Sequence, residues 1–135
     1  MQEKSVFELI LSGELDSEFI YEDEEIFAIN DINPVAKVHI LIIPKRKIET
    51  INDTSLEDQN LLGKMILVAK DLAKKYNINK SGYRLITNCE SDGGQEIPYL
   101  HFHLVGGLPL GRMIGLQKNS QKLFKKFKED KINIT

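Results

Sequence analysis

Pro98-Tyr99-Leu100-His101-Phe102-His103-Leu104-Val105-Gly106-Gly107 is the stretch around which the rest of this chain is organised. Its residues alternate in character over seven positions, which predicts a β-strand buried on one face. The apolar face would consist of Leu100, Phe102 and Leu104. Tyr99, His101 and His103 would share the other face, where same-face neighbours lie roughly 7 Å apart. Two imidazoles at that spacing can bracket one small anionic group, so we take this face as the candidate active site.

The composition is that of an ordinary globular protein. A chain of 135 residues is long enough for one domain with a sizeable core. Its net charge of −2 argues against a general role in binding nucleic acid. The single cysteine, Cys89, rules out an internal disulfide framework and fits a reducing compartment. Without a long apolar run or a cationic leader, the chain is expected to be cytoplasmic and not inserted in a membrane.

Capping signals and hydrophobic periodicity predict an α+β fold. Ser5 can cap a short helix over residues 5–11, and Thr54 with Glu57 forms a capping box that opens a long helix ending near Tyr76. Strands are expected at residues 18–21, 26–29, 38–44, 83–88 and 99–105. The sequence therefore predicts an antiparallel sheet of about five strands packed against one long helix.

Two further features bear on the candidate site. Residues 38–44 are apolar almost throughout, which is typical of a central strand buried on both faces. The exception, His39, is a satisfied core histidine unless it lies beside the other two. Residues 89–95 form a polar turn containing Gly93 and Gly94, whose backbone N–H groups can surround an anion. Most such turns merely reverse the chain, but this one leads directly into the histidine strand.

The C-terminal stretch 117–131 carries six lysines against two acids, with apolar residues at helical spacing. This pattern predicts a terminal amphipathic helix that docks through its apolar residues. A basic arm touching nucleic acid is the alternative interpretation. We divide the chain accordingly into one domain, residues 1–115, and a basic, helical tail, residues 116–135.

From the local pattern alone, three uses of the histidines remain open. A neutral imidazole is a good nucleophile toward phosphorus near pH 7, and a second imidazole can stabilise the phosphate oxygens. Alternatively, His101 and His103 together with His39 can hold a zinc ion with an open fourth position. In the third interpretation the histidines simply line a polar surface.

From residue 5 to about residue 115 the chain resembles the histidine triad (HIT) family, specifically its Hint branch of nucleoside phosphoramidases. The family motif, His-φ-His-φ-His-φ-φ with φ apolar, is represented here by residues 99–105. Three other stretches match in order and spacing: residues 19–23, 31–45 and 88–95. Agreement across four segments is far more specific than the motif alone.

The resemblance implies a hydrolase of purine nucleoside phosphoramidates or related AMP conjugates that needs no metal or other cofactor. His101 aligns with the nucleophile that forms a nucleotidyl-histidine intermediate, and His103 with the histidine that contacts phosphate. His39 aligns with the upstream histidine that completes their hydrogen-bonded set. Asp31 aligns with the carboxylate that binds the ribose hydroxyls, and Ile32 adjoins it.

The resemblance also implies a nucleotide pocket and a partner. The apolar pocket for a purine base, adenine or guanine, aligns with Val6, Phe7, Ile10, Leu15, Ile29 and Leu41. The loop at the phosphate aligns with Asn88, Gly94 and Gln95. Members of the family form homodimers through the long helix and the sheet edge, so the same pairing is expected here.

Two residues depart from the family pattern. Tyr99 replaces the first histidine of the triad, and a phenol can donate a hydrogen bond but cannot carry an imidazolium charge. Glu96 stands where the family has a serine that assists the leaving group. A carboxylate there either repels the phosphate or, if its pKa is raised, acts as a general acid. The alternative function is therefore a nucleotide-binding module with reduced or lost catalysis.

Overall fold

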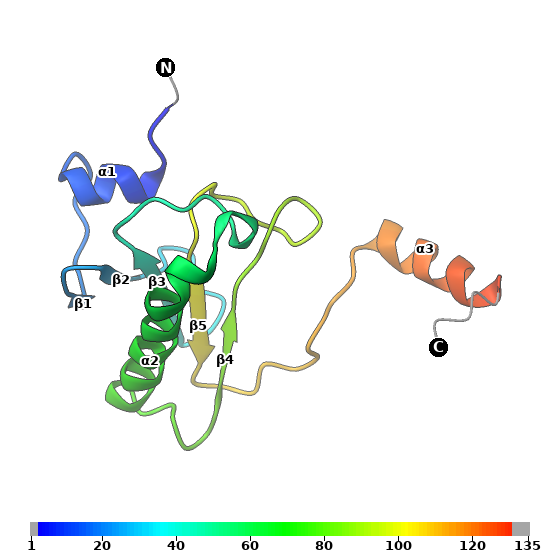
Figure 1. The fold of residues 1–135 in the computed structure, drawn as a ribbon. Coiled ribbons are helices and arrows are strands. Elements are labelled where there is room, and N and C mark those ends of the chain that lie inside the picture. The colour runs from blue at the N-terminus through cyan, green and yellow to red at the C-terminus, as the bar shows by residue number, and fades with distance from the viewer. Residues whose placement is uncertain (1–2, 131–135) are drawn as a thin grey trace.

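The computed structural model describes residues 3–130, which form a five-stranded antiparallel sheet with helices packed on its two faces (Figure 1). The strand order is β1-β2-β3-β5-β4. The strands span Tyr21–Glu22 (β1), Ile26–Asn30 (β2), Val38–Pro44 (β3), Tyr83–Ile86 (β4) and Phe102–Gly106 (β5). The helices span Val6–Ser12 (α1), Gln59–Lys75 (α2) and Lys118–Glu129 (α3), and short 3₁₀ turns lie at Ile51–Asp53 and Leu56–Asp58. The predicted α+β fold is confirmed.

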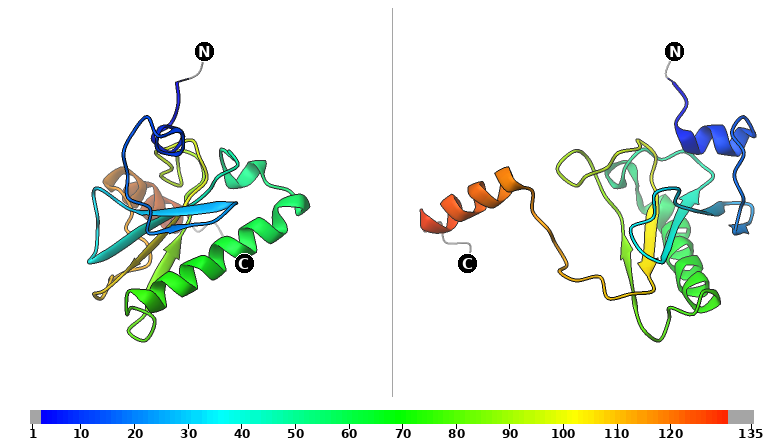
Figure 2. Two further views of the ribbon diagram at one scale, coloured as in Figure 1. Left: turned by 90° about the vertical axis from the view of Figure 1, so that its left-hand side faces the viewer. Right: turned by 180° about the vertical axis from the view of Figure 1, so that it is seen from behind.

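The central strand β3 separates two apolar cores because alternate residues of a strand point to opposite faces. On one face, Ile40 and Ile42 pack with Met65 of α2. On the other face, Leu41 and Ile43 pack with Phe7 of α1. The two helices therefore cover opposite sides of the sheet, as the turned views show (Figure 2).

The position of β3 explains how His39 can reach the candidate site. β3 pairs with β2 on one side and β5 on the other, which confirms the prediction of a buried central strand. His39 shares its strand face with Leu41 and Ile43, since residues two apart point the same way. His39 therefore belongs to the face covered by α1.

The histidine strand starts later than its alternation predicts. The backbone N–H of Leu100 donates to Ile48 O at 2.6 Å, so β5 pairs with β3 only from Phe102 onward. The alternation of faces nevertheless persists through the preceding residues. Leu100 belongs to the core on the α2 side, and Tyr99 to the core on the α1 side. The predicted separation of the two faces is correct, whereas the predicted start of the strand is wrong.

The long helix also begins later than predicted. The capping box is formed by Ser55 and Asp58 instead of Thr54 and Glu57. Ser55 N donates to Asp58 Oδ2 at 2.9 Å, and Glu57 N donates to Ser55 Oγ at 3.3 Å. This box caps a 3₁₀ turn, and α2 follows it directly. The sequence predicted that the long helix ends near Tyr76, and α2 ends at Lys75, with Tyr76 as its C-cap.

The first strand is shorter than the predicted range 18–21. β1 starts only at Tyr21 and ends at Glu22, one residue beyond the predicted end. A side chain closes the turn that follows it. Asp23 Oδ1 accepts hydrogen bonds from the backbone N–H groups of Glu25, at 2.7 Å, and Ile26, at 2.9 Å. The acidic run is therefore a hairpin turn, as predicted.

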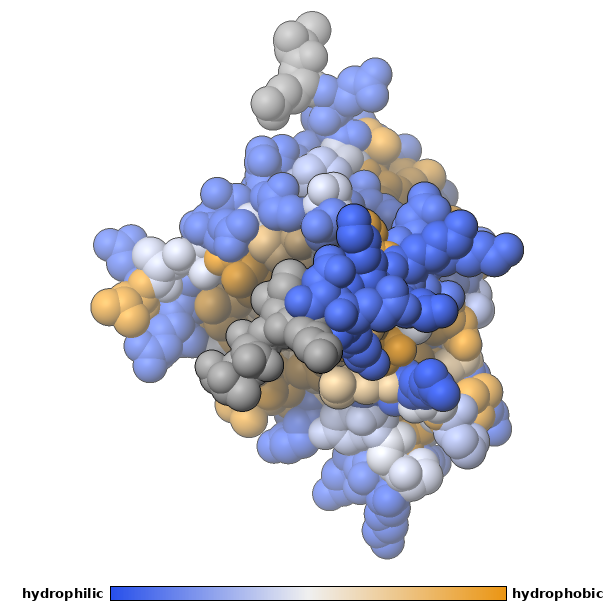
Figure 3. Space-filling view, turned by 90° about the vertical axis from the view of Figure 1, so that its right-hand side faces the viewer, coloured by the Kyte–Doolittle hydropathy of each residue, from blue (hydrophilic) through white to orange (hydrophobic). Residues whose placement is uncertain are grey.

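The tail forms the predicted helix, but α3 does not dock onto the sheet. Figure 1 shows α3 at the end of an extended segment, apart from the rest of the fold. Leu123 is 69% exposed and Phe124 47% exposed, and the Phe124 and Phe127 rings stack on each other at 6.2 Å. Hydrophilic side chains lie nearest the viewer on this side of the molecule (Figure 3). The predicted end of the helix, Lys131, lies outside the described residues.

None of the helices within residues 3–130 is long and apolar enough to cross a membrane.

Candidate active site

A cleft of about 730 Å³ opens on the α1 face of the sheet. Its walls come from α1, the end of β2, the segment joining β2 to β3, the first half of β3, the loop before β5 and β5 itself. Fourteen of the predicted site residues line it: Val6, Phe7, Ile10, Leu15, Ile29, Asp31, Ile32, His39, Leu41, Asn88, Gly94, Glu96, His101 and His103. The fold thus brings candidate catalytic and candidate binding residues to one place. The two remaining candidates, Tyr99 and Gln95, do not line the cleft.

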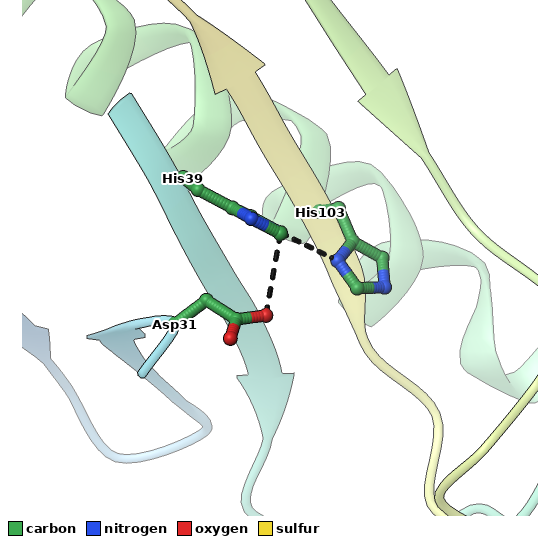
Figure 4. Close-up of side chains that lie close together, drawn as sticks. All are labelled: Asp31, His39 and His103. Atoms are coloured by element: carbon green, nitrogen blue, oxygen red, sulfur yellow. Dashed lines mark hydrogen bonds and ion pairs between the residues drawn. The ribbon is translucent and has the colours of Figure 1, made fainter. Parts of the chain in front are cut away.

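The register of β3 and β5 places two histidines side by side. Leu41 lies opposite His103, so His39 sits one same-face position away on the neighbouring strand. His39 Nε2 and His103 Nδ1 are 2.9 Å apart. Asp31 follows β2, and its Oδ2 lies 3.4 Å from His39 Nε2, as Figure 4 shows. His39 is therefore part of the site and not a separate core histidine.

A backbone N–H group determines the tautomers of this pair. Val35 N–H donates to His39 Nδ1 at 3.1 Å, so the proton of a neutral His39 lies on Nε2. That proton is donated to His103 Nδ1, which makes His103 an acceptor at Nδ1. The proton of a neutral His103 consequently lies on Nε2, where it is available to donate to a ligand. Protons are assigned here from the hydrogen-bonding partners.

His101 has the opposite tautomer. Its Nδ1–H donates to the backbone carbonyl of Tyr99 at 2.7 Å, which leaves the Nε2 lone pair free. The ring is 8% exposed and lies edge-on to two rings, those of Phe7 at 5.0 Å and His103 at 4.9 Å between centroids. The site therefore combines one imidazole presenting a lone pair with a neighbouring imidazole presenting an N–H.

Burial favours the neutral forms of both rings. It lowers the pKa of His101 below its ordinary 6.5, although the Tyr99 carbonyl and Asp31 act in the opposite direction. The pKa of His103 falls to about 4, first through burial and then through the nearby His101 and His39. Both imidazoles are thus uncharged near pH 7 in the free protein. His101 is in the form that can act as a nucleophile.

The glycine turn before β5 requires both of its glycines. A Cβ on Gly93 would lie 2.3 Å from the carbonyl oxygen of Cys89, which leaves no room for a side chain. Gly94 has a φ of +80°, in the left-handed region that favours glycine. Gly94 lies at the cleft wall with Asn88. At Gly94 the turn therefore presents main-chain atoms to the cleft, with no side chain between them and a ligand.

The side chain of Gln95 braces this loop and does not face the cleft. Its Nε2 donates to Glu49 O at 2.7 Å and to Ile97 O at 3.0 Å. Its Oε1 accepts from the backbone N–H of Glu90 at 3.1 Å. These three bonds occupy both ends of the amide and tie the loop to the segment after β3.

Tyr99 acts on the site through its backbone instead of its phenol. The hydroxyl donates to two backbone carbonyls, Pro44 O at 2.7 Å and Lys45 O at 2.9 Å, within the core on the α1 side. Burial and the charge of Glu8 raise the pKa of the phenol to about 12, so it remains a donor. Its carbonyl holds His101, as described above. Tyr99 thus positions the candidate nucleophile through its backbone carbonyl.

Six cleft residues were not found from sequence: Asp16, Ser17, Asn30, Asn33, Val35 and Ile97. Val35 matters most, because its backbone N–H orients His39. A main-chain N–H donor cannot be recognised from the residue type, because every residue except proline has one. The only signal was its place between Pro34 and His39, in the predicted turn before the central strand.

Asp31, His39 and His103 are also the donors from which a metal site would be built. Their ligand atoms all lie within 4.8 Å of one another. Two nitrogens bound to one tetrahedral zinc at about 2.0–2.1 Å would be separated by roughly 3.3 Å. The observed 2.9 Å between the two histidine nitrogens instead fits one shared proton. The geometry favours a hydrogen-bonded pair at this point in the cleft.

Fold and site together define an α+β protein with a histidine cluster on one face of its central strands β3 and β5. The family model described as "HIT domain" matches residues 12–110. This match covers well over half of the chain, so the chain belongs to the HIT family.

Relatives and solved structures agree with this assignment. Purine nucleoside phosphoramidase of Escherichia coli (strain K12) is 46% identical over 114 residues, covering 84% of this chain and 96% of that protein. An uncharacterized HIT-like protein of Buchnera aphidicola is 43% identical, covering 82% and 98%. The HIT family hydrolase from Clostridium thermocellum is 42% identical with a TM-score of 0.80, covering 85% of this chain and 100% of that structure.

The buried phenol of Tyr99 gives a first testable prediction. Replacing it in Tyr99→Phe leaves the carbonyls of Pro44 and Lys45 without their donor, which should lower the free energy of unfolding by about 1–3 kcal/mol. Urea denaturation followed by circular dichroism measures this change.

Tyr83→Phe is the matched control, because Tyr83 is 39% exposed on β4. Its effect should stay within about 0.5 kcal/mol. Equal stabilities of the two variants would show that the Tyr99 hydroxyl makes no such bonds.

Proposed function

We propose that this protein hydrolyses purine nucleoside 5′-phosphoramidates, with His101 as the nucleophile. The observation that carries the proposal is the free Nε2 of His101 beside the N–H of His103, at the buried end of the cleft. A lone pair and a donor on one strand face suit attack at phosphorus with stabilisation of its oxygens. The similarity to a purine nucleoside phosphoramidase supports the same reaction class.

The proposed reaction proceeds in two displacements at phosphorus. His101 Nε2 forms a bond to the α-phosphorus while the P–N bond to the amine breaks, and the departing nitrogen takes up one proton. Water then attacks the phosphorus, the bond to His101 breaks, and the water gives up one proton. The nucleoside 5′-monophosphate and the free amine are the products, and the two protons balance. No metal takes part in either step.

Other cleft residues have roles consistent with this reaction. His103 Nε2–H donates to a phosphate oxygen, and His39 holds His103 in the required tautomer. Asp31 lies close enough to the cluster to bind ribose hydroxyls while its Oδ1 accepts from the N–H of Asn33 at 2.8 Å. The apolar wall formed by Val6 and its neighbours suits a purine base.

The direct test is an assay with an adenosine phosphoramidate whose free amine is fluorescent. His101→Ala should lower kcat/KM by at least about 10³-fold, because the nucleophile is removed. His103→Ala should lower it by about 10²–10³-fold, because one donor to the developing charge is lost.

Binding of AMP by calorimetry serves as the control for folding, and both variants should retain it. Wild-type and His101→Ala proteins with equal rates would remove His101 from the mechanism. Tight AMP binding by the wild type, with no turnover of the phosphoramidate, would instead favour the nucleotide-binding module.

We further propose that two copies of the chain pair through α2 and β4. β4 lies at the edge of the sheet and hydrogen-bonds to β5 alone within the described residues, so its outer edge can extend the sheet of a second copy. On α2, Ile66 and Leu67 are 51% and 56% exposed, and Tyr83 of β4 is 39% exposed. Exposed apolar residues on adjoining elements are typical of an interface between copies.

Leu67→Glu should therefore convert a dimer into a monomer, because it places a charge in the apolar centre of the proposed interface. Light scattering coupled to size-exclusion chromatography measures the mass. Leu56→Glu is the control, since Leu56 is 88% exposed in the turn before α2, and it should remain dimeric. A wild type that elutes as a monomer at high concentration would contradict the proposal.

A further inference from the structure

The cleft is unusual for a phosphate site in the sign of its charges. Among the described residues that line it there is no lysine and no arginine, whereas Asp16, Asp31 and Glu96 contribute carboxylates. Burial lowers the pKa of His101 and of His103, so these two rings add no positive charge near pH 7. A substrate entering this cleft therefore meets negative charge that no cationic side chain of the lining offsets.

Two of the three carboxylates, Asp16 and Glu96, are exposed, and Glu96 lies on the loop that leads to His101. Within residues 3–130 Glu96 makes no hydrogen bond or ion pair. The loop around it is fixed, because the Gln95 side chain bonds to Ile97 O and so spans the position of Glu96. Its carboxylate is thus held at the rim of the cleft without a charge partner.

The position of the proposed nucleophile, His101, indicates where the leaving group of the substrate lies relative to Glu96. His101 lines the cleft and is buried, at 8% exposure. In an in-line displacement the leaving group departs from the side of the phosphorus opposite the attacking atom. The leaving group must therefore extend from the buried His101 toward the solvent-facing rim, where Glu96 lies.

We infer that Glu96 is a specificity-determining residue that selects phosphoramidates whose leaving amine carries a second, positively charged amino group. This inference rests on the proposed function and names its substrate class. A phosphoramidate brings one negative charge into the cleft, and an ammonium group beyond the nitrogen would meet the carboxylate of Glu96. A polyphosphate leaving group would place further negative charges against it and is disfavoured by the same force.

The test uses two substrates that differ in one charge. These are the adenosine 5′-phosphoramidates of n-butylamine and of 1,4-diaminobutane, which present the same chain with and without a terminal ammonium. For the wild type at low salt, kcat/KM should favour the diamine substrate about 3- to 10-fold. The preference should shrink as salt is added, because exposed charges are screened.

Three variants separate Glu96 from the rest of the loop. Glu96→Gln should bring the ratio close to 1, and Glu96→Lys should reverse it. Asp92→Asn is the matched control, because Asp92 is an exposed acid of the same loop that does not line the cleft, and it should keep the wild-type ratio. Comparison with Glu96→Gln also corrects for any difference in the intrinsic reactivity of the two amines.

The outcomes distinguish this inference from the proposed function. If the wild type hydrolyses neither substrate, the proposed function fails. If it hydrolyses both at equal kcat/KM, the function stands and the selection by Glu96 is wrong. If it prefers the diamine substrate but Glu96→Gln keeps that preference, Glu96 is not the source. Glu96→Asp should preserve the preference, which separates a role of charge from damage to the loop.

Discussion

The site depends on the hydrogen bond from the backbone N–H of Val35 to Nδ1 of His39. It forces the remaining proton of His39 toward His103, which then presents its own N–H to the cleft. A second backbone group, the carbonyl of Tyr99, sets the opposite tautomer in His101. Two main-chain contacts thus decide which ring presents a lone pair to the cleft and which ring presents an N–H, before any ligand is bound.

The sheet makes these contacts possible by separating its two faces. The core under α2 can be purely apolar, whereas the face under α1 carries the histidines of β3 and the segment entering β5. Phe7 packs edge-on against His101, and burial lowers the pKa of that ring. The same burial that stabilises the fold therefore prepares the proposed nucleophile, and the exposed acidic rim supplies selectivity.

Much of the fold and of the candidate site was predictable from the sequence, and the features that were not predicted have physical explanations. Alternation around His101 and the apolar run containing His39 predicted the strands and the fold, because strand periodicity is local. That His39 joins the other two histidines was implied only by the resemblance to the HIT family. The hydroxyl of Tyr99 and the amide of Gln95 were expected near the nucleotide but bond to backbone carbonyls instead. Those carbonyls come from the last residue of β3 and the segment after it, about fifty residues away in the chain. Such tertiary contacts leave no local pattern. The exposed position of α3 was missed for the same reason.

The tautomers of the three histidines can be measured directly. Nitrogen-15 NMR of the imidazole rings near neutral pH should show His101 protonated at Nδ1, and His39 and His103 protonated at Nε2. On acidification, His101 and His103 should remain neutral below pH 6.5, with His103 titrating at about 4. A proton on Nε2 of His101 at neutral pH, or an imidazolium at that position, would contradict the account.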